Sequence, residues 1–151
     1  IGMRSSEGRA LSEKLIDNCR KINENMNEIS TRSKQTPNEY YKKLKQRVEE
    51  LMSNIEIQLD ENTLAREVAI LAEKADISEE LVRLDSHMNQ FISSCENNRG
   101  QVGRRLDFIC QEMLREANTI ASKSLDTEIT NCVLDVKCLI DQIKEQVQNI
   151  E

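Results

Sequence analysis

The 151 residues fit one domain or a piece of a larger one, and with 32% charged, 38% hydrophobic and 3% aromatic residues they have the composition of long helices with narrow apolar seams. The low aromatic content argues against the base-stacking platforms of many modules that bind single-stranded nucleic acid. The formal net charge of −6 means that the chain as a whole repels polyanions, so contact with a nucleic acid requires a local basic patch.

Cysteine and histidine usage argues against disulfides and zinc. The five cysteines form an odd set without C-x-x-C spacing, and His87 is the only histidine, so we expect buried thiols in a reducing compartment. Zinc is not expected, because the chain has one histidine and no paired thiolates, and we expect no organic cofactor, since no Gly-rich phosphate loop is present. Without an apolar run of about 18 residues or a secretory segment, the protein is expected to be cytoplasmic and to have no membrane span. The start at Ile1 indicates a fragment.

Residues 1–59 are expected to form an arm of two long helices, one over residues 3–33 and one from residue 37 onward. In the first helix, apolar residues recur at the three-and-four spacing of a coiled-coil seam, at Leu11, Leu15, Cys19, Ile22, Met26 and Ile29. A break is predicted at residues 35–39, where Thr36 suits an N-cap, Pro37 the first helical position and Glu39 a capping box. The second seam is Tyr41, Leu44, Val48, Leu51 and Ile55. The two seams predict an antiparallel, coiled-coil-like hairpin that serves as a spacer or oligomerisation arm.

Residues 60–151 are expected to form a core domain of three to four helices. A short helix is predicted over residues 63–73 and another over 76–95, with Asp76 as its N-cap and Glu79 as the capping-box partner. Turn residues at 96–100 lead to a helix over 103–124, and the last helix spans residues 126–150. The fold class is therefore predicted to be all-α, a long antiparallel hairpin plus a compact bundle.

The helix predicted over residues 103–124 is the most informative part of the chain. Opposite its apolar face, one polar stripe holds Arg104, Asp107, Gln111, Arg115, Asn118 and Ser122, and a neighbouring stripe holds Arg105, Glu112, Glu116 and Lys123. Between residues 99 and 123, five cations and three carboxylates give a local charge of +2, which leaves −8 for the rest of the chain. This region is therefore the candidate for a patch that contacts a polyanion.

Two groups of residues on the predicted helices suit chemistry. His87 is the only residue of the type that changes its charge near neutral pH, and it shares a helix flank with Glu80 and Arg83. This arrangement suits proton transfer, and it equally suits a histidine that caps or decorates a helix. Glu112 and Glu116 supply two carboxylates for a divalent cation, Mg or Mn, beside arginines that suit phosphate. A lattice of surface ion pairs explains the same carboxylates, so both interpretations stay open.

Several runs of residues resemble the C-terminal half of the bacterial YicC-like proteins. They are ADISEELVRLDSHMNQF over residues 75–91, GRRLDFICQEMLREANTIASKS over 103–124 and EQVQNIE over 145–151, and MRSSEGRAL over 3–11 resembles the point where that half begins. The resemblance implies a cytoplasmic endoribonuclease that assembles as trimers paired into hexamers and closes around structured RNA. It also implies that the chain is one continuous C-terminal domain of a longer protein whose N-terminal domain is absent here.

The resemblance further implies roles for polar residues on two helices. The family's polar signature falls on Glu79, Glu80, Arg83, His87, Arg104, Arg105, Asp107, Gln111, Glu112, Arg115, Glu116, Asn118, Thr119, Ser122 and Lys123. From this we predict a catalytic set of His87, Glu112, Glu116 and Asp107, with Glu112 and Glu116 also as metal ligands. RNA is predicted to be bound by Arg83, Arg104, Arg105, Gln111, Arg115, Asn118, Ser122 and Lys123. The alternative is a non-catalytic helical oligomerisation scaffold, or an RNA-binding adaptor, whose polar stripes form subunit contacts.

Overall fold

Five helices account for nearly all of the described chain. The structure, a computed structural model, describes residues 2–53, 60–96 and 103–148, with side chains from residue 13 onward. The helices are α1 (Gly2–Met52), α2 (Glu61–Lys74), α3 (Ser78–Glu96), α4 (Gly103–Lys123) and α5 (Thr127–Gln148). The described residues contain no strand, so the all-α prediction is confirmed. None of these helices is long and apolar enough to cross a membrane.

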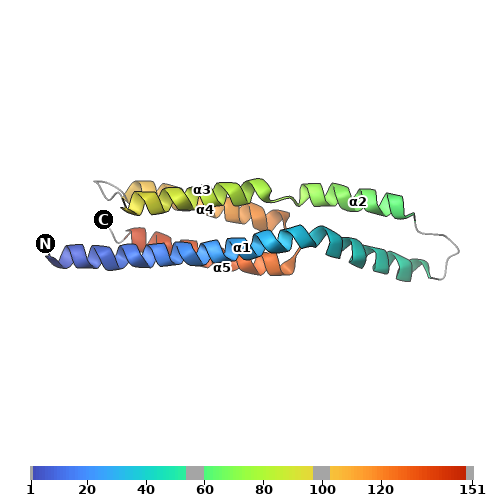
Figure 1. Ribbon diagram of the computed structural model, residues 1–151, viewed down its shortest axis with the longest axis horizontal. Coiled ribbons are helices and arrows are strands. Elements are labelled where there is room, and N and C mark those ends of the chain that lie inside the picture. The colour runs from blue at the N-terminus through green and yellow to red at the C-terminus, as the bar shows by residue number, and fades with distance from the viewer. Residues whose placement is uncertain (1, 54–59, 97–102, 149–151) are drawn as a thin grey trace.

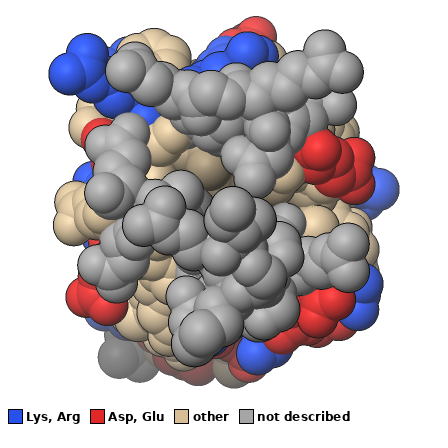
Figure 2. Space-filling model, turned by 90° about the vertical axis from the view of Figure 1, so that its left-hand side faces the viewer, with Lys and Arg blue, Asp and Glu red and all other residues tan. Residues whose placement is uncertain are grey.

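Four of the helices form an antiparallel bundle. The first part of α1, α3, α4 and α5 run alternately in opposite directions, and α4 lies between α3 and α5 while α1 closes the bundle on α5 and α3 (Figure 1). At the end of the bundle that faces the viewer in Figure 2, the described Lys and Arg side chains alternate with Asp and Glu around the rim. Such mixed charge is typical of the solvated faces of a helical bundle.

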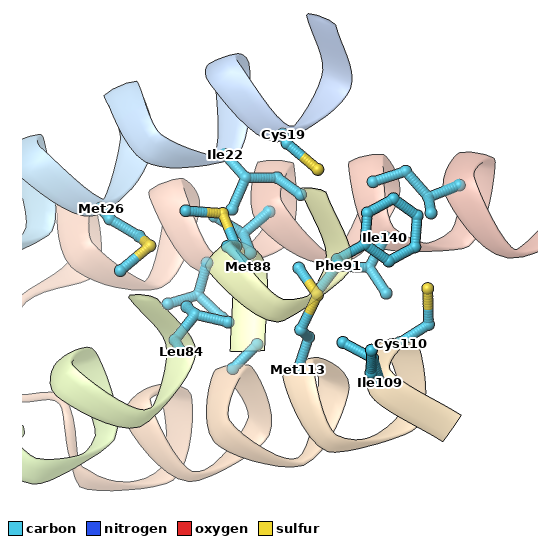
Figure 3. Packing of buried hydrophobic residues seen from close by; sticks show 14 of the residues in the cluster. Cys19, Ile22, Met26, Leu84, Met88, Phe91, Ile109, Cys110, Met113 and Ile140 are labelled. Carbon is cyan, nitrogen blue, oxygen red and sulfur yellow. The ribbon is translucent and has the colours of Figure 1, made fainter. Parts of the chain in front are cut away.

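The bundle has a single apolar core built from the three-and-four spacing of each helix. Side chains from α1, α3, α4 and α5 converge on it (Figure 3). Phe91 is fully buried there, together with Leu84 and Met88 of the same helix face. Complete burial of one such side chain stabilises the folded state by about 1.5–3 kcal/mol. The core therefore fixes which face of α3 and of α4 points inward, and with it the position of their polar flanks.

The break predicted at residues 35–39 is wrong, because α1 continues through Pro37. Thr36 does not cap a new helix, and its hydroxyl donates a hydrogen bond to the Arg32 carbonyl at 2.9 Å, one turn earlier. A proline inside a helix removes one backbone hydrogen bond and bends the helix, and α1 changes direction in this region (Figure 1). The helix persists because tertiary packing holds it on both sides, on α5 and α3 before the proline and on α2 after it.

An antiparallel hairpin is present, but different segments form it. The end of α1 pairs with α2 rather than with the beginning of α1, and α2 buries Leu64 and Val68 against it (Figure 1). An exposed ion pair between Lys45 and Glu61, at 2.8 Å, joins the two helices. The expected seam residue Ile55 and the Leu11 side chain lie outside the described residues.

Residues Leu15 to Ile29 of α1 belong to the bundle core and not to a separate arm. The division of the chain at residue 59 stays a prediction. The helices expected over residues 63–73, 76–95, 103–124 and 126–150 are confirmed to within a few residues at each described end.

A bidentate ion pair ties α1 to the start of α5. Arg32 donates from Nε to Asp126 Oδ2 at 2.9 Å and from Nη2 to Oδ1 at 3.3 Å, and its Nη1 lies 3.0 Å from Glu128. The Asp126 carboxylate also accepts a hydrogen bond from the Glu128 backbone N–H at 2.9 Å, which caps α5. Burial alone raises the pKa of Asp126, but the hydrogen bonds from Arg32 and the Glu128 N–H outweigh it and lower the pKa overall.

Candidate functional site at the α3–α4 seam

The seam between α3 and α4 carries an ion network with two buried carboxylates. Arg83 of α3 donates from Nε to Glu116 Oε1 of α4 at 2.9 Å, although Glu116 is only 5% exposed. Two further contacts join Arg83 to its own helix, at 3.5 Å to Glu80 and 3.4 Å to Glu79. One guanidinium therefore serves three carboxylates and fixes the register of α3 against α4.

Lys123 completes the network from the end of α4. Its Nζ lies 2.6 Å from Glu80 Oε1 and 3.3 Å from the carbonyl oxygen of Asp76. Glu80 is 3% exposed, and burial alone raises its pKa. The hydrogen bond from Lys123, a backbone N–H and the charges of Lys123 and Arg83 outweigh burial and lower the pKa, so the carboxylate is held ionised. We call Glu79, Glu80, Arg83, Glu116 and Lys123 the seam network.

One acceptor of the seam network has no partner. Glu80 Oε2 is buried and accepts no hydrogen bond within the described part of the chain. A buried carboxylate oxygen without a donor is costly, because it loses its hydration without replacement. The network thus places paired charges in the interior at a free-energy cost, which a purely structural seam of apolar residues would avoid.

His87 and Glu112 occupy the next turn of the seam. His87 follows Arg83 by four residues on α3, and Glu112 precedes Glu116 by four on α4, so each lies one turn further along its helix. Since the two helices are antiparallel, both steps lead in the same direction from the Arg83–Glu116 pair. His87 is half-buried, and the Glu112 side chain, 24% exposed, lies 3.9 Å from Arg115. The structure thus gathers five of the predicted site residues along one seam.

The polar stripe of α4 that begins at Arg104 points away from the seam. Gln111, Arg115, Asn118 and Ser122 are exposed and line a shallow hollow on the outer face of α4. Asp107 belongs with them, because its Oδ2 accepts a hydrogen bond from Gln111 Nε2 at 3.1 Å. The structure therefore does not bring Asp107 to Glu112 and Glu116, and its catalytic role stays a prediction.

Arg104 and Arg105 lie at the start of α4 and are exposed. Arg105 lines a shallow groove together with α3 residues, among them Asp85 and Asn89. Neither arginine forms an ion pair with any residue that the structure describes. Both guanidinium groups therefore remain available to an outside ligand.

Glu112 and Glu116 do not form a ready metal site. Across residues 13–53, 60–96 and 103–148, no three His, Cys, Asp or Glu side chains are grouped so that they could hold a metal ion. Glu116 is buried and already accepts a hydrogen bond from Arg83, which leaves Glu112 as the accessible carboxylate of the pair. Mg²⁺ needs near-octahedral oxygen coordination, and one accessible carboxylate provides only a small part of it.

The predicted catalytic and RNA-binding sets omit two residues of the seam network, the exposed Glu79 and the buried Glu80. The place of Glu80 on one flank with Arg83 and His87 is visible from spacing alone. Its burial is not, because that depends on Lys123, which lies 43 positions away in the sequence. The signals that the sequence offered were this flank and the family's polar signature, which includes Glu80.

The comparisons with known proteins agree with the resemblance. Residues 29–151 match the family described as Endoribonuclease YicC-like, C-terminal. The chain is 44% identical to a probable endoribonuclease YicC of Clostridioides difficile over 149 residues, which is 99% of its length. It is 34% identical to a probable endoribonuclease YicC of Haemophilus influenzae over all 151 residues. It covers 50% and 51% of these two proteins, so it spans about half the length of the curated relatives it matches.

Proposed function

Because the chain belongs to the YicC-like endoribonuclease family, matched by its C-terminal domain, we propose that it binds structured RNA and contributes the catalytic residues for phosphodiester cleavage. The seam network carries this proposal. Buried, paired carboxylates beside the only histidine of the chain are typical of a site that positions a proton-transfer group.

In the proposed mode of binding, the exposed face of α4 holds the RNA backbone. Arg104, Arg105 and Arg115 have planar guanidinium groups, which suit bidentate contact with phosphate. Gln111, Asn118 and Ser122 offer neutral donors and acceptors for 2′-hydroxyl groups, which distinguish RNA from DNA. Shape and 2′-hydroxyl recognition of a folded RNA needs little aromatic stacking, in agreement with the 3% aromatic content.

His87 is the proposed proton-transfer group. A half-buried imidazole one turn from Arg83 can exchange a proton with a ribose hydroxyl or a leaving oxygen while a cation binds the phosphate. Arg83, whose side chain is 47% exposed, holds Glu116 and still presents part of its guanidinium to solvent. Glu112 is the proposed acceptor that orients His87 or a water molecule, and Lys123 fixes Glu80 at the end of the seam.

Cleavage of a labelled RNA hairpin tests these roles. We expect His87→Ala and Glu112→Gln to lower the cleavage rate by about 10²-fold or more, the usual contribution of a general acid or base. Glu128→Gln, an exposed carboxylate on α5, is the matched control and should leave the rate unchanged. Rates should be compared for this chain and for the full-length Clostridioides difficile relative carrying the equivalent substitutions. Undiminished cleavage by the His87 variant would remove the proposed proton transfer.

Participation of Mg²⁺ or Mn²⁺ is a separate part of the proposal. The residues present do not make a preformed site, so no step of the proposed reaction passes through the metal. Cleavage measured with EDTA and with added Mg²⁺ or Mn²⁺ decides this point. An unchanged metal requirement in a Glu112→Gln, Glu116→Gln double variant would exclude these carboxylates as the ligands.

A helical oligomerisation scaffold is the second candidate function. It is favoured by the hairpin of α1 and α2, which extends beyond the bundle and carries half-buried side chains such as Tyr41, Leu44 and Val48 (Figure 1). We propose that the protein forms a homo-oligomer, a trimer or a hexamer. A protein can form oligomers and also cleave RNA. If it serves only as a scaffold, it should form oligomers and show no affinity for RNA.

A further inference from the structure

Phe108 is an aromatic side chain left on the surface of α4. The chain contains two phenylalanines, and they have opposite environments: Phe91 is fully buried in the core, whereas Phe108 is 62% exposed. Its position on α4 places it one turn after Arg104 and one turn before Gln111, on the outer face. A single exposed apolar side chain is common on protein surfaces, so the case for a binding role of Phe108 rests on the charged residues near it on α4.

The surroundings of Phe108 are cationic and weakly neutralised. Arg104 and Arg105 have no ion-pair partner among the described residues, and Arg115 reaches only Glu112, at 3.9 Å. The nearest acid in sequence, Asp107, accepts a hydrogen bond from Gln111 and keeps its charge, so the three arginines exceed the two carboxylates, Asp107 and Glu112, on this part of α4. Three arginines therefore lie within two helical turns of Phe108 on α4, in a chain whose net charge is −6. This face can attract a polyanion that the molecule as a whole repels.

We infer that Phe108 stacks on an unpaired base of the bound RNA while Arg104, Arg105 and Arg115 bind the flanking phosphates. A planar apolar ring among cations matches a nucleotide, which has a flat base attached to an anionic backbone. A second copy of the chain fits less well, because with only two phenylalanines and two tyrosines it offers few flat rings to stack on Phe108. The inference rests on the proposed function and narrows its substrate to structured RNA with a loop or bulge.

Binding of two RNAs of equal length at one fixed salt concentration tests the inference. One is a stem-loop with 2-aminopurine in the loop, and the other is a fully paired duplex. We expect Phe108→Ala to weaken stem-loop binding by about tenfold, the loss of one base stack, and to leave duplex binding within about twofold. Phe108→Tyr, which keeps a ring, should restore stem-loop affinity and the quenching of 2-aminopurine.

Leu134→Ala is the matched control, since Leu134 is 53% exposed and lies on α5, a different helix from the three arginines. Because Phe108 is largely exposed, its variants should keep the far-UV circular dichroism of the parent. Equal binding of the stem-loop by the parent chain and Phe108→Ala would overturn the inference and leave the proposed function standing. Loss of oligomer mass by light scattering in Phe108→Ala would overturn it in favour of a subunit contact. A parent chain that binds neither RNA would overturn the inference and the proposed RNA binding together.

Discussion

At the scale of single residues, the carboxylates of the seam network are the feature to explain. Glu80 and Glu116 are almost completely buried, and each relies on a cation from the other helix. The sequence placed Arg83 and His87 on one flank and Glu112 and Glu116 on one stripe by spacing alone. It could not pair the flanks, because the two hydrogen bonds span 33 and 43 positions and depend on how α3 and α4 pack.

Removal of the Lys123 charge should destabilise the fold strongly. The Lys123→Met variant leaves the buried Glu80 carboxylate with Arg83 as its only cation. We expect the free energy of unfolding, measured by urea titration, to fall by about 3 kcal/mol, the lower limit of the usual cost of breaking a buried ion pair. Lys21→Met is the control, because Lys21 forms an exposed pair with Asp17 that contributes at most about 1 kcal/mol. Equal losses in the two variants would show that the Glu80–Lys123 pair does not stabilise the seam.

Acid should weaken the fold through the caps and the seam. The pKa values of Asp126, Asp76 and Glu80 are lowered in the folded state, so the unfolded chain binds protons more readily. The stability that these groups contribute is present above their unfolded pKa values, 3.8 for Asp and 4.5 for Glu, and is lost as the pH falls through the lowered values.

Urea titrations at several pH values measure this loss. The decline of the free energy of unfolding below about pH 4 should be shallower in Asp126→Asn, which removes one of the three groups. An identical pH profile for the parent and the variant would contradict the role of the Arg32–Asp126 pair.

At the scale of the helices, the sequence predicted helix for all five described elements and the approximate bounds of the last four, because their apolar residues repeat at steps of three and four. It failed at Pro37. The local signal of Thr36, Pro37 and Glu39 is that of a helix start, and nothing in those residues reveals that α5, α3 and α2 hold α1 together on both sides. Tertiary contacts outweigh the local preference of Thr36, Pro37 and Glu39 for a helix start. The end of α1 therefore forms its antiparallel hairpin with α2 and not with the beginning of α1.

Replacement of Pro37 by alanine tests the continuous helix. Pro37→Ala restores one backbone N–H and one hydrogen bond inside α1, so we expect the free energy of unfolding to rise by about 1–2 kcal/mol and helical content to stay the same or increase. If residues 35–39 were a capped break, proline would suit the first helical position, and alanine there would destabilise the protein. A loss of stability in Pro37→Ala would therefore restore the broken-helix interpretation.

At the scale of the whole molecule, the charge distribution makes an RNA-binding domain and a scaffold differ in their expected response to salt. The chain carries a net charge of −6, yet Arg104 and Arg115 are exposed on the outer face of α4, and Arg105 is exposed beside them on the side toward α3. Each phosphate contact releases counterions, so RNA held by these arginines must respond steeply to salt, whereas a scaffold has no RNA affinity to lose. The match to about half of each curated relative makes the activity of the isolated chain a matter for experiment.

A titration of a labelled RNA hairpin with the chain at about 50 and 200 mM salt tests the central claim most directly. For three phosphate contacts, we expect the dissociation constant to rise roughly 20- to 40-fold between the two salt concentrations. An Arg104→Gln, Arg115→Gln double variant should bind more weakly at low salt and lose most of this salt dependence. The absence of measurable binding at the lower salt concentration, or an affinity that does not change with salt, would contradict the account.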